Sequence, residues 1–209
     1  KLGYNMHAII TDGSISKYIN HPKPLVIGDV QYPARIFSAW TASELAAIGI
    51  IEVTFDDSNK KDEQWYINTN QTFTYDADAG TVTAAYGTAT AKAHADTLFT
   101  AQDETDGLGT EGDVKDEGLK TKLIRTVKAQ AEGLLNQTDW YITRKAEKNT
   151  AIPSAITTWR DGIRTKQAAM ETLITNASDT PALETLYTYT TDSDGVTSRP
   201  LGEFPKLGS

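Results

Sequence analysis

The stretch LLNQTDWYITRKAEKNTAIPSAITTWRDGIR, residues 134–164, connects two segments whose apolar side chains recur at steps of three and four. That spacing places the apolar residues of each segment on one face of an α-helix. The face before the connection consists of Leu119, Leu123, Ile124, Val127, Ala131, Leu134 and Leu135. The face after it consists of Ile156, Trp159, Ile163, Met170, Leu173 and Ile174. Neither face is stable in water, so we predict an antiparallel helical hairpin with the two faces packed together.

The bend of this hairpin is predicted to comprise Thr138, Asp139, Trp140, Tyr141 and Ile142. The two short polar side chains can bond nearby backbone NH groups, and the three large apolar ones can close the open end of the hairpin. Pro153 suits the first turn of the second helix, because the NH group that proline lacks would have no partner there. The sequence therefore predicts a tight, tryptophan-bearing bend.

The same stretch resembles the C-terminal domain of tail fibre assembly chaperones of tailed bacteriophages, and of related fibre- or baseplate-associated virion proteins. The resemblance rests on Leu134, Leu135, Thr138, Asp139, Trp140, Trp159, Arg160, Ile163 and Arg164. In that family a Leu-Leu-x-x-Thr-Asp-Trp corner precedes a helix with a Trp/Tyr-Arg-x-x-Leu/Val-Arg pattern, and the agreement spans about thirty residues. This chain departs from the family by spelling the corner T-D-W-Y-I-T-R and by carrying long segments on both sides.

The resemblance implies a protein that acts through contacts with other phage tail proteins. We expect a structural component of the tail, fibre- or baseplate-associated, made in the cytoplasm of the bacterial host and kept in the virion as a homo- or hetero-oligomer. A tail fibre assembly chaperone is the alternative, and a glycan-binding or glycan-degrading tail protein is a more remote one. The predicted partner interface comprises Asp139, Trp140, Tyr141, Arg144, Arg160 and Arg164.

Two types of residue in the stretch 134–164 have two possible roles each. A tryptophan can stack on a partner or fill the hairpin core, and Trp159 is expected in the core because it lies on the apolar face. Arg160 and Arg164 lie one helical turn apart beside that face. They can pair with Asp139 or Asp161, or they can project to a partner protein.

The whole chain is expected to have an α+β fold. Short segments that alternate between apolar and polar residues, separated by turn pairs such as Asp12-Gly13 and Gly28-Asp29, predict strands near the N-terminus. The predicted organisation is an antiparallel β domain with one short helix in residues 1–87, a helix and an acidic glycine-rich loop in 88–118, the helical hairpin in 119–187 and an extended C-terminal arm in 188–209. The helix of the second segment is predicted over residues 89–100.

Composition argues against several classes of partner. A formal charge of −8 opposes nucleic-acid binding, which needs a basic surface. The sequence lacks the run of about 18 apolar residues that a membrane helix needs, so no membrane partner is expected. The absence of cysteine excludes disulfides and thiolate metal sites, in keeping with a reducing cytoplasm. Because the first residue is Lys1 instead of methionine, we expect a processed or partial chain.

Motifs of enzymes and cofactor sites are incomplete. Residues 107–112 fit the pattern G-x-G-x-x-G, but no apolar strand precedes them and the neighbouring acidic residues would repel a pyrophosphate. The histidines His7, His21 and His94 lack the short spacings of a zinc site. We therefore expect no enzymatic activity, no cofactor and no metal ion.

Overall fold

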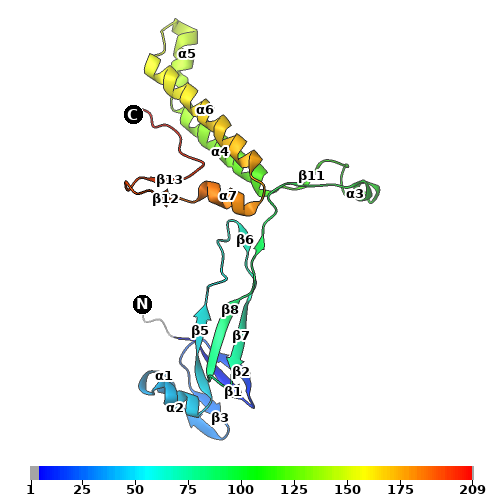
Figure 1. Cartoon of the computed structure of the whole chain (residues 1–209), viewed down its shortest axis with the longest axis vertical. Coiled ribbons are helices and arrows are strands. Elements are labelled where there is room, and N and C mark those ends of the chain that lie inside the picture. The colour runs from blue at the N-terminus through cyan, green and yellow to red at the C-terminus, as the bar shows by residue number, and fades with distance from the viewer. Residues whose placement is uncertain (1–4, 209) are drawn as a thin grey trace. The chain divides into compact units, whose positions relative to one another are not determined.

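The computed structural model describes residues 5–208 and divides into two compact units, residues 1–90 and 91–209. The first unit is built mainly of strands, and the second contains the long helices (Figure 1). The predicted α+β class is therefore confirmed.

A five-stranded sheet with the order β2-β1-β5-β8-β7 forms the centre of the first unit. The strands of this unit are β1 (His7–Thr11), β2 (Ser14–Ile19), β3 (Leu25–Ile27), β4 (Val30–Tyr32), β5 (Ile50–Asp56), β6 (Tyr66–Ile67), β7 (Gln71–Asp76) and β8 (Thr81–Tyr86). β9 (Thr90–Ala91) lies at the boundary between the units and pairs with β6. β3 and β4 form a separate hairpin around Gly28 and Asp29, as predicted.

The prediction of a purely antiparallel sheet is wrong at one strand pair. β5 and β8 are parallel, with Val53 opposite Val82, whereas the other pairings in the sheet are antiparallel. The chain leaves β5, returns along β7 at the edge of the sheet and then enters β8 between them. Alternation of apolar residues shows which side chains face inward but not the direction of a strand, so the sequence pattern is the same for either pairing.

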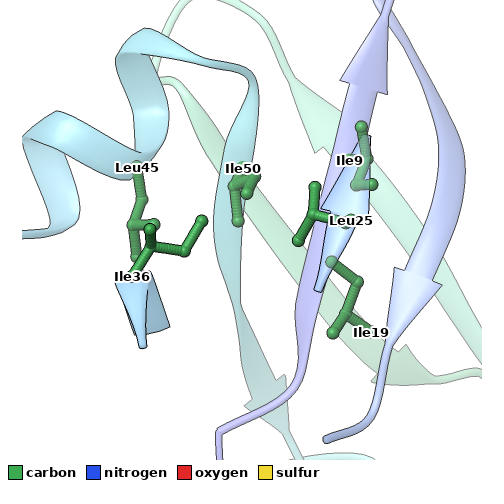
Figure 2. Packing of buried hydrophobic residues seen from close by; sticks show 6 residues of the cluster. All are labelled: Ile9, Ile19, Leu25, Ile36, Leu45 and Ile50. Atoms are coloured by element: carbon green, nitrogen blue, oxygen red, sulfur yellow. The ribbon is translucent and has the colours of Figure 1, made fainter. Parts of the chain in front are cut away.

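The sheet is covered on both faces. On one face, Figure 2 shows six aliphatic side chains converging from three strands of the sheet, the β3–β4 hairpin and two short helices. These side chains belong to Ile9, Ile19, Leu25, Ile36, Leu45 and Ile50. The other face holds Ala8, Val53, Val82 and Ala84, with Phe73 and Tyr75 packed against them. Tyr18 on β2 and Phe73 on β7 have ring centroids 4.7 Å apart, so the two edge strands curl toward each other.

Two short helices, α1 (Ile36–Ala39) and α2 (Ala42–Ala47), stand where one was predicted. α1 is a single turn of four residues, too short to show a helical period in the sequence. Thr41 caps α2 through a capping box: its side-chain oxygen accepts a bond from the Glu44 NH, and the Glu44 carboxylate accepts one from the Thr41 NH at 2.7 Å. Gly49 follows with φ +79° and returns the chain to β5.

We expect Gly49→Ala to destabilise the first unit by more than about 1 kcal/mol. An alanine would be strained at this positive φ, and its Cβ would lie 2.8 Å from the carbonyl oxygen of Ile10. Gly80→Ala is the matched control, since φ is +64° there but a Cβ would meet nothing within 4 Å. Denaturant unfolding of both variants isolates the clash with Ile10; equal losses would show that the clash is relieved without cost.

The predicted helical hairpin is present in the second unit. This unit contains β10 (Thr97–Leu98), α3 (Ala101–Thr105), β11 (Val114–Asp116), α4 (Leu119–Asn136), α5 (Asp139–Lys148), α6 (Ser154–Asn176), α7 (Thr180–Tyr187), β12 (Thr190–Thr191) and β13 (Thr197–Ser198). α4 and α6 lie side by side (Figure 1). α5 follows the C-terminal end of α4 and leads to the start of α6. Ala131, Trp159 and Ile163 form a buried cluster between them, with Leu134 and Leu135 against it. Trp159 therefore fills the core, as predicted.

The helix predicted over residues 89–100 is not present. This segment holds β9 and β10, and the residues between them form the N-terminal cap of α4. The carbonyl oxygens of Ala93 and His94 accept bonds from the first NH groups of α4, and the Asp96 carboxylate accepts from the Gly118 NH and the Thr121 hydroxyl, both at 2.7 Å. The Thr121 hydroxyl, followed by the Gly118 NH, lowers the pKa of Asp96. α4 has no capping side chain of its own, so these tertiary bonds satisfy its first NH groups. They outweigh the preference of the alanine-rich residues 89–100 for a helix of their own.

The acidic segment predicted as an irregular loop contains α3 and β11 and extends away from the helices (Figure 1). Thr100 and Asp103 form a capping box at α3, and Lys115 bonds the Asp103 carboxylate at 2.7 Å. The lysine ammonium, followed by the Thr100 NH and hydroxyl, holds the pKa of Asp103 well below its usual range. β10 pairs with β11, so the two ends of this segment are hydrogen-bonded to each other. We call residues 97–116, from β10 to β11, the acidic arm.

The C-terminal segment is also more ordered than the predicted extended arm. Residues 188–198 include the β12–β13 hairpin, and Leu201 beyond it is fully buried. Phe204 packs against the cluster between α4 and α6, and the carbonyl oxygen of Pro205 accepts a hydrogen bond from Trp159 Nε1 at 2.9 Å. The segment is therefore part of the helical core of its own chain.

Candidate interaction site

Four of the residues on which the family resemblance rests meet at the C-terminal end of α4. We call this group, Leu135, Thr138, Asp139 and Arg160, the clamp. Arg160 on α6 donates from Nη1 to the Leu135 carbonyl oxygen at 2.8 Å and to Thr138 Oγ1 at 2.7 Å, and Nη2 lies 2.8 Å from Asp139 Oδ1. The Thr138 hydroxyl donates to the same Leu135 carbonyl at 3.1 Å. Arg160 thereby satisfies the end of one helix and fixes the start of the next.

The bend predicted at residues 138–142 is instead the beginning of a helix of ten residues, α5. Thr138 bonds a carbonyl group and an arginine, not the backbone NH groups expected of it. Asp139 occupies the first turn of α5, where a carboxylate is favoured by the helix dipole, and Lys145 and Lys148 occupy the last turn. Asn149 ends α5 with φ +52°, the left-handed conformation that asparagine tolerates at a helix end.

α5 carries an exposed surface of aromatic and cationic side chains. The rings of Trp140 and Tyr141 stack with centroids 3.7 Å apart and an interplanar angle of 28°. Arg144 lies one turn further along, with its guanidinium carbon 4.8 Å from the Trp140 centroid and 5.1 Å from the Tyr141 centroid. Trp140 is 51% exposed and Ile142 is 45% exposed. We call Trp140, Tyr141 and Arg144 the α5 surface.

This surface corrects the prediction that the apolar residues of the bend close the open end of the hairpin. They lie on the outside of α5, because the ten-residue helix carries them away from the core cluster of α4 and α6. The cost of exposing Trp140 is reduced by its contacts with Tyr141 and Arg144, since a guanidinium group over a ring face is attracted to it. Arg144 Nε is buried and has no hydrogen-bond partner within residues 5–208, so the contacts that hold this side chain are those with the two rings.

The six predicted interface residues do not form one surface. Asp139, Trp140, Tyr141 and Arg144 lie together on α5, whereas Arg160 is only 7% exposed and acts inside the clamp. Arg164 is exposed, lies 3.3 Å from Asp161 and lines a cavity of about 620 Å³ along α6. Both arginines form ion pairs within the chain, which is the first of the two roles left open for them. Arg160 is also buried too deeply to project to a partner.

Two exposed apolar groups were not predicted as part of an interface. Ile142 follows Trp140 by two residues in α5, about 200° around the helix, so it is exposed on the opposite side of that helix. The acidic arm exposes Leu98, Leu108 and Val114. Their signal in the sequence is weak, because single apolar residues within a polar segment are common on protein surfaces.

Within the described residues 5–208, no group of three or more histidine and carboxylate side chains could hold a metal ion. In the same part of the chain, no helix is long and apolar enough to cross a membrane.

Comparisons of the chain with models of protein families, with curated proteins and with solved structures found no match.

Proposed function

We propose that this protein is a structural component of a bacteriophage tail, fibre- or baseplate-associated, that acts through contacts with other tail proteins. The proposal joins the family resemblance of residues 134–164 to one observation: α5 exposes a tryptophan that stacks on a half-buried tyrosine and lies against an arginine. Tryptophan, tyrosine and arginine are the residues most enriched among those that dominate binding energy at protein interfaces.

The clamp supports this role because it gives the surface a fixed position. Arg160 connects α6 to the last turn of α4 and to Asp139, so the start of α5 is held by charge-assisted hydrogen bonds. The rings of Trp140 and Tyr141 are already stacked, so little side-chain entropy remains to be lost when a partner covers them. A pre-ordered aromatic surface is suited to binding another protein.

Quantitative mass spectrometry of purified particles tests the proposal. A virion component is expected at a fixed copy number relative to the other tail proteins. Particles assembled with Trp140→Ala and Arg144→Ala together are expected to contain less of the chain or to lack the neighbouring fibre or baseplate proteins. Val196→Ala is the control, because Val196 is another exposed apolar residue but lies outside the α5 surface.

A tail fibre assembly chaperone is the alternative, because the sequence motif is shared with such chaperones. Absence of the chain from purified particles, together with fibres that fail to assemble when it is removed, would favour the chaperone. Cleavage of a capsular polysaccharide by the purified chain would displace both functions in favour of a glycan-degrading protein.

A further inference from the structure

A small cavity of about 220 Å³ lies in the first unit, between β1, β5 and the two short helices. Its wall includes Asn5, His7, Phe37, Trp40 and Glu52. Sites for drug-sized ligands have volumes of about 300–1,000 Å³. This cavity is smaller and has room for a small ion or the end of one side chain.

The polar groups in the wall are arranged as hydrogen-bond acceptors. Asn5 Nδ2 donates to Glu52 Oε1 at 2.5 Å, which leaves the amide oxygen of Asn5 and the second carboxylate oxygen of Glu52 to accept. His7 Nδ1 lies 2.9 Å from the Asn5 carbonyl oxygen. A carbonyl oxygen can only accept, so Nδ1 is the donor in this bond.

The charge in the cavity is not neutralised within the described chain. Glu52 has no ion-pair partner among residues 5–208. His7 and Glu52 face each other across the antiparallel pair β1–β5, so their side chains lie on the same face of the sheet. Phe37 packs edge-on against the His7 ring at 5.0 Å, and the half-exposed Trp40 supplies a second aromatic wall. Acceptors, a carboxylate and aromatic rings together favour a ligand with a positive charge and hydrogen-bond donors.

We propose that this cavity binds an organic cation, an ammonium or guanidinium group, with Glu52 as its charge partner and Trp40 as its aromatic contact. The amide oxygen of Asn5 accepts one of its hydrogen bonds. The group can belong to a lysine or arginine side chain of a partner protein or to a free amine. The inference does not depend on the function proposed above, because none of these residues belongs to α5.

Titration of the ¹⁵N-labelled chain with n-butylammonium, followed by NMR, tests the proposal. We expect shifts confined to the cavity, including the Trp40 indole NH, and a dissociation constant in the millimolar range because the site is partly open. n-Butanol, a neutral ligand of similar size, is expected to bind about tenfold more weakly or not at all. Equal binding of the two ligands, or no shift at Trp40, would overturn the proposal.

Two variants assign the interaction to named groups. Glu52→Gln keeps an acceptor for Asn5 but removes the charge, so we expect about a tenfold loss of n-butylammonium affinity. Asp29→Asn removes a carboxylate from the β3–β4 turn and is expected to leave the affinity unchanged. Unchanged affinity in Glu52→Gln would refute the role of the carboxylate, and unperturbed spectra elsewhere verify that each variant is folded.

A further measurement identifies the source of the cation. A blocked tripeptide with a central lysine is expected to bind at least as tightly as n-butylammonium if the cavity takes a partner's side chain. Weaker binding of the peptide would support a free amine as the ligand.

Discussion

Trp159→Ala is expected to lower the free energy of unfolding of the second unit by about 3–5 kcal/mol. Trp159 is 7% exposed, lies between α4 and α6 with Ala131 and Ile163, and donates a hydrogen bond to the Pro205 carbonyl. Alanine would leave a cavity there and would also release the C-terminal segment from the helices. Guanidinium unfolding followed by far-UV circular dichroism measures the loss, because the long helices that dominate the signal belong to this unit.

Trp140→Ala provides the matched control, since it removes the same side chain from an exposed position. We expect it to change the free energy of unfolding by less than about 1 kcal/mol, because Trp140 stacks on Tyr141 and lies against Arg144 of the same helix while solvent covers half of it. Comparing the two variants therefore distinguishes a tryptophan that stabilises the fold from one that is available for binding. A large loss of stability from Trp140→Ala would mean that the α5 surface is part of a core and not an interface.

Arg160→Ala is expected to lower the free energy of unfolding by about 2–3 kcal/mol. The change removes two charge-assisted hydrogen bonds from the buried clamp and leaves the Leu135 carbonyl with the NH and the hydroxyl of Thr138 as partners. The ion pair with Asp139 contributes little to this figure, because that carboxylate is half-exposed and returns to water. Hydrogen exchange is expected to accelerate most at the start of α5, where the clamp holds the backbone.

Arg164→Ala tests whether the loss of stability depends on the burial of the arginine or only on its place on α6. Arg164 and its partner Asp161 are both more than half exposed, so we expect a change within about 0.5 kcal/mol. Arg160→Lys keeps the charge but loses the planar guanidinium fork, so it is expected to restore less than half of the stability lost in Arg160→Ala. Equal effects of Arg160→Ala and Arg164→Ala would contradict the clamp.

The elements predicted correctly are those defined by local chemistry. The hairpin turn at Asp12 and Gly13 has positive φ at both residues, which is the conformation that this pair favours. Asp179 caps α7 by accepting a bond from the Ala182 NH, the role that aspartate favours at the residue before a helix. In each case the deciding interaction lies within a few residues of the sequence.

The elements predicted wrongly depend on distant partners. Asp96 caps a helix that begins more than twenty residues later, so the alanines around it do not continue a helix of their own. Phe204 and Pro205 pack on the helical hairpin, although proline and glycine in that segment are typical of an extended tail. The interface prediction included Arg160, which is buried, since an arginine beside an apolar stripe has the same sequence pattern whether it is buried or exposed.

The amino-acid sequence by itself determined that two apolar helical faces would pack against each other and that alternating strands would precede them, because periodicity records which side of each element avoids water. Only the tertiary structure decided that β8 runs parallel to β5, that α5 carries Trp140 outward and that Arg160 is buried against Leu135 and Thr138. The physical reason is that a local pattern specifies the need for a cover but not the residues that provide it, and those residues come from far along the chain.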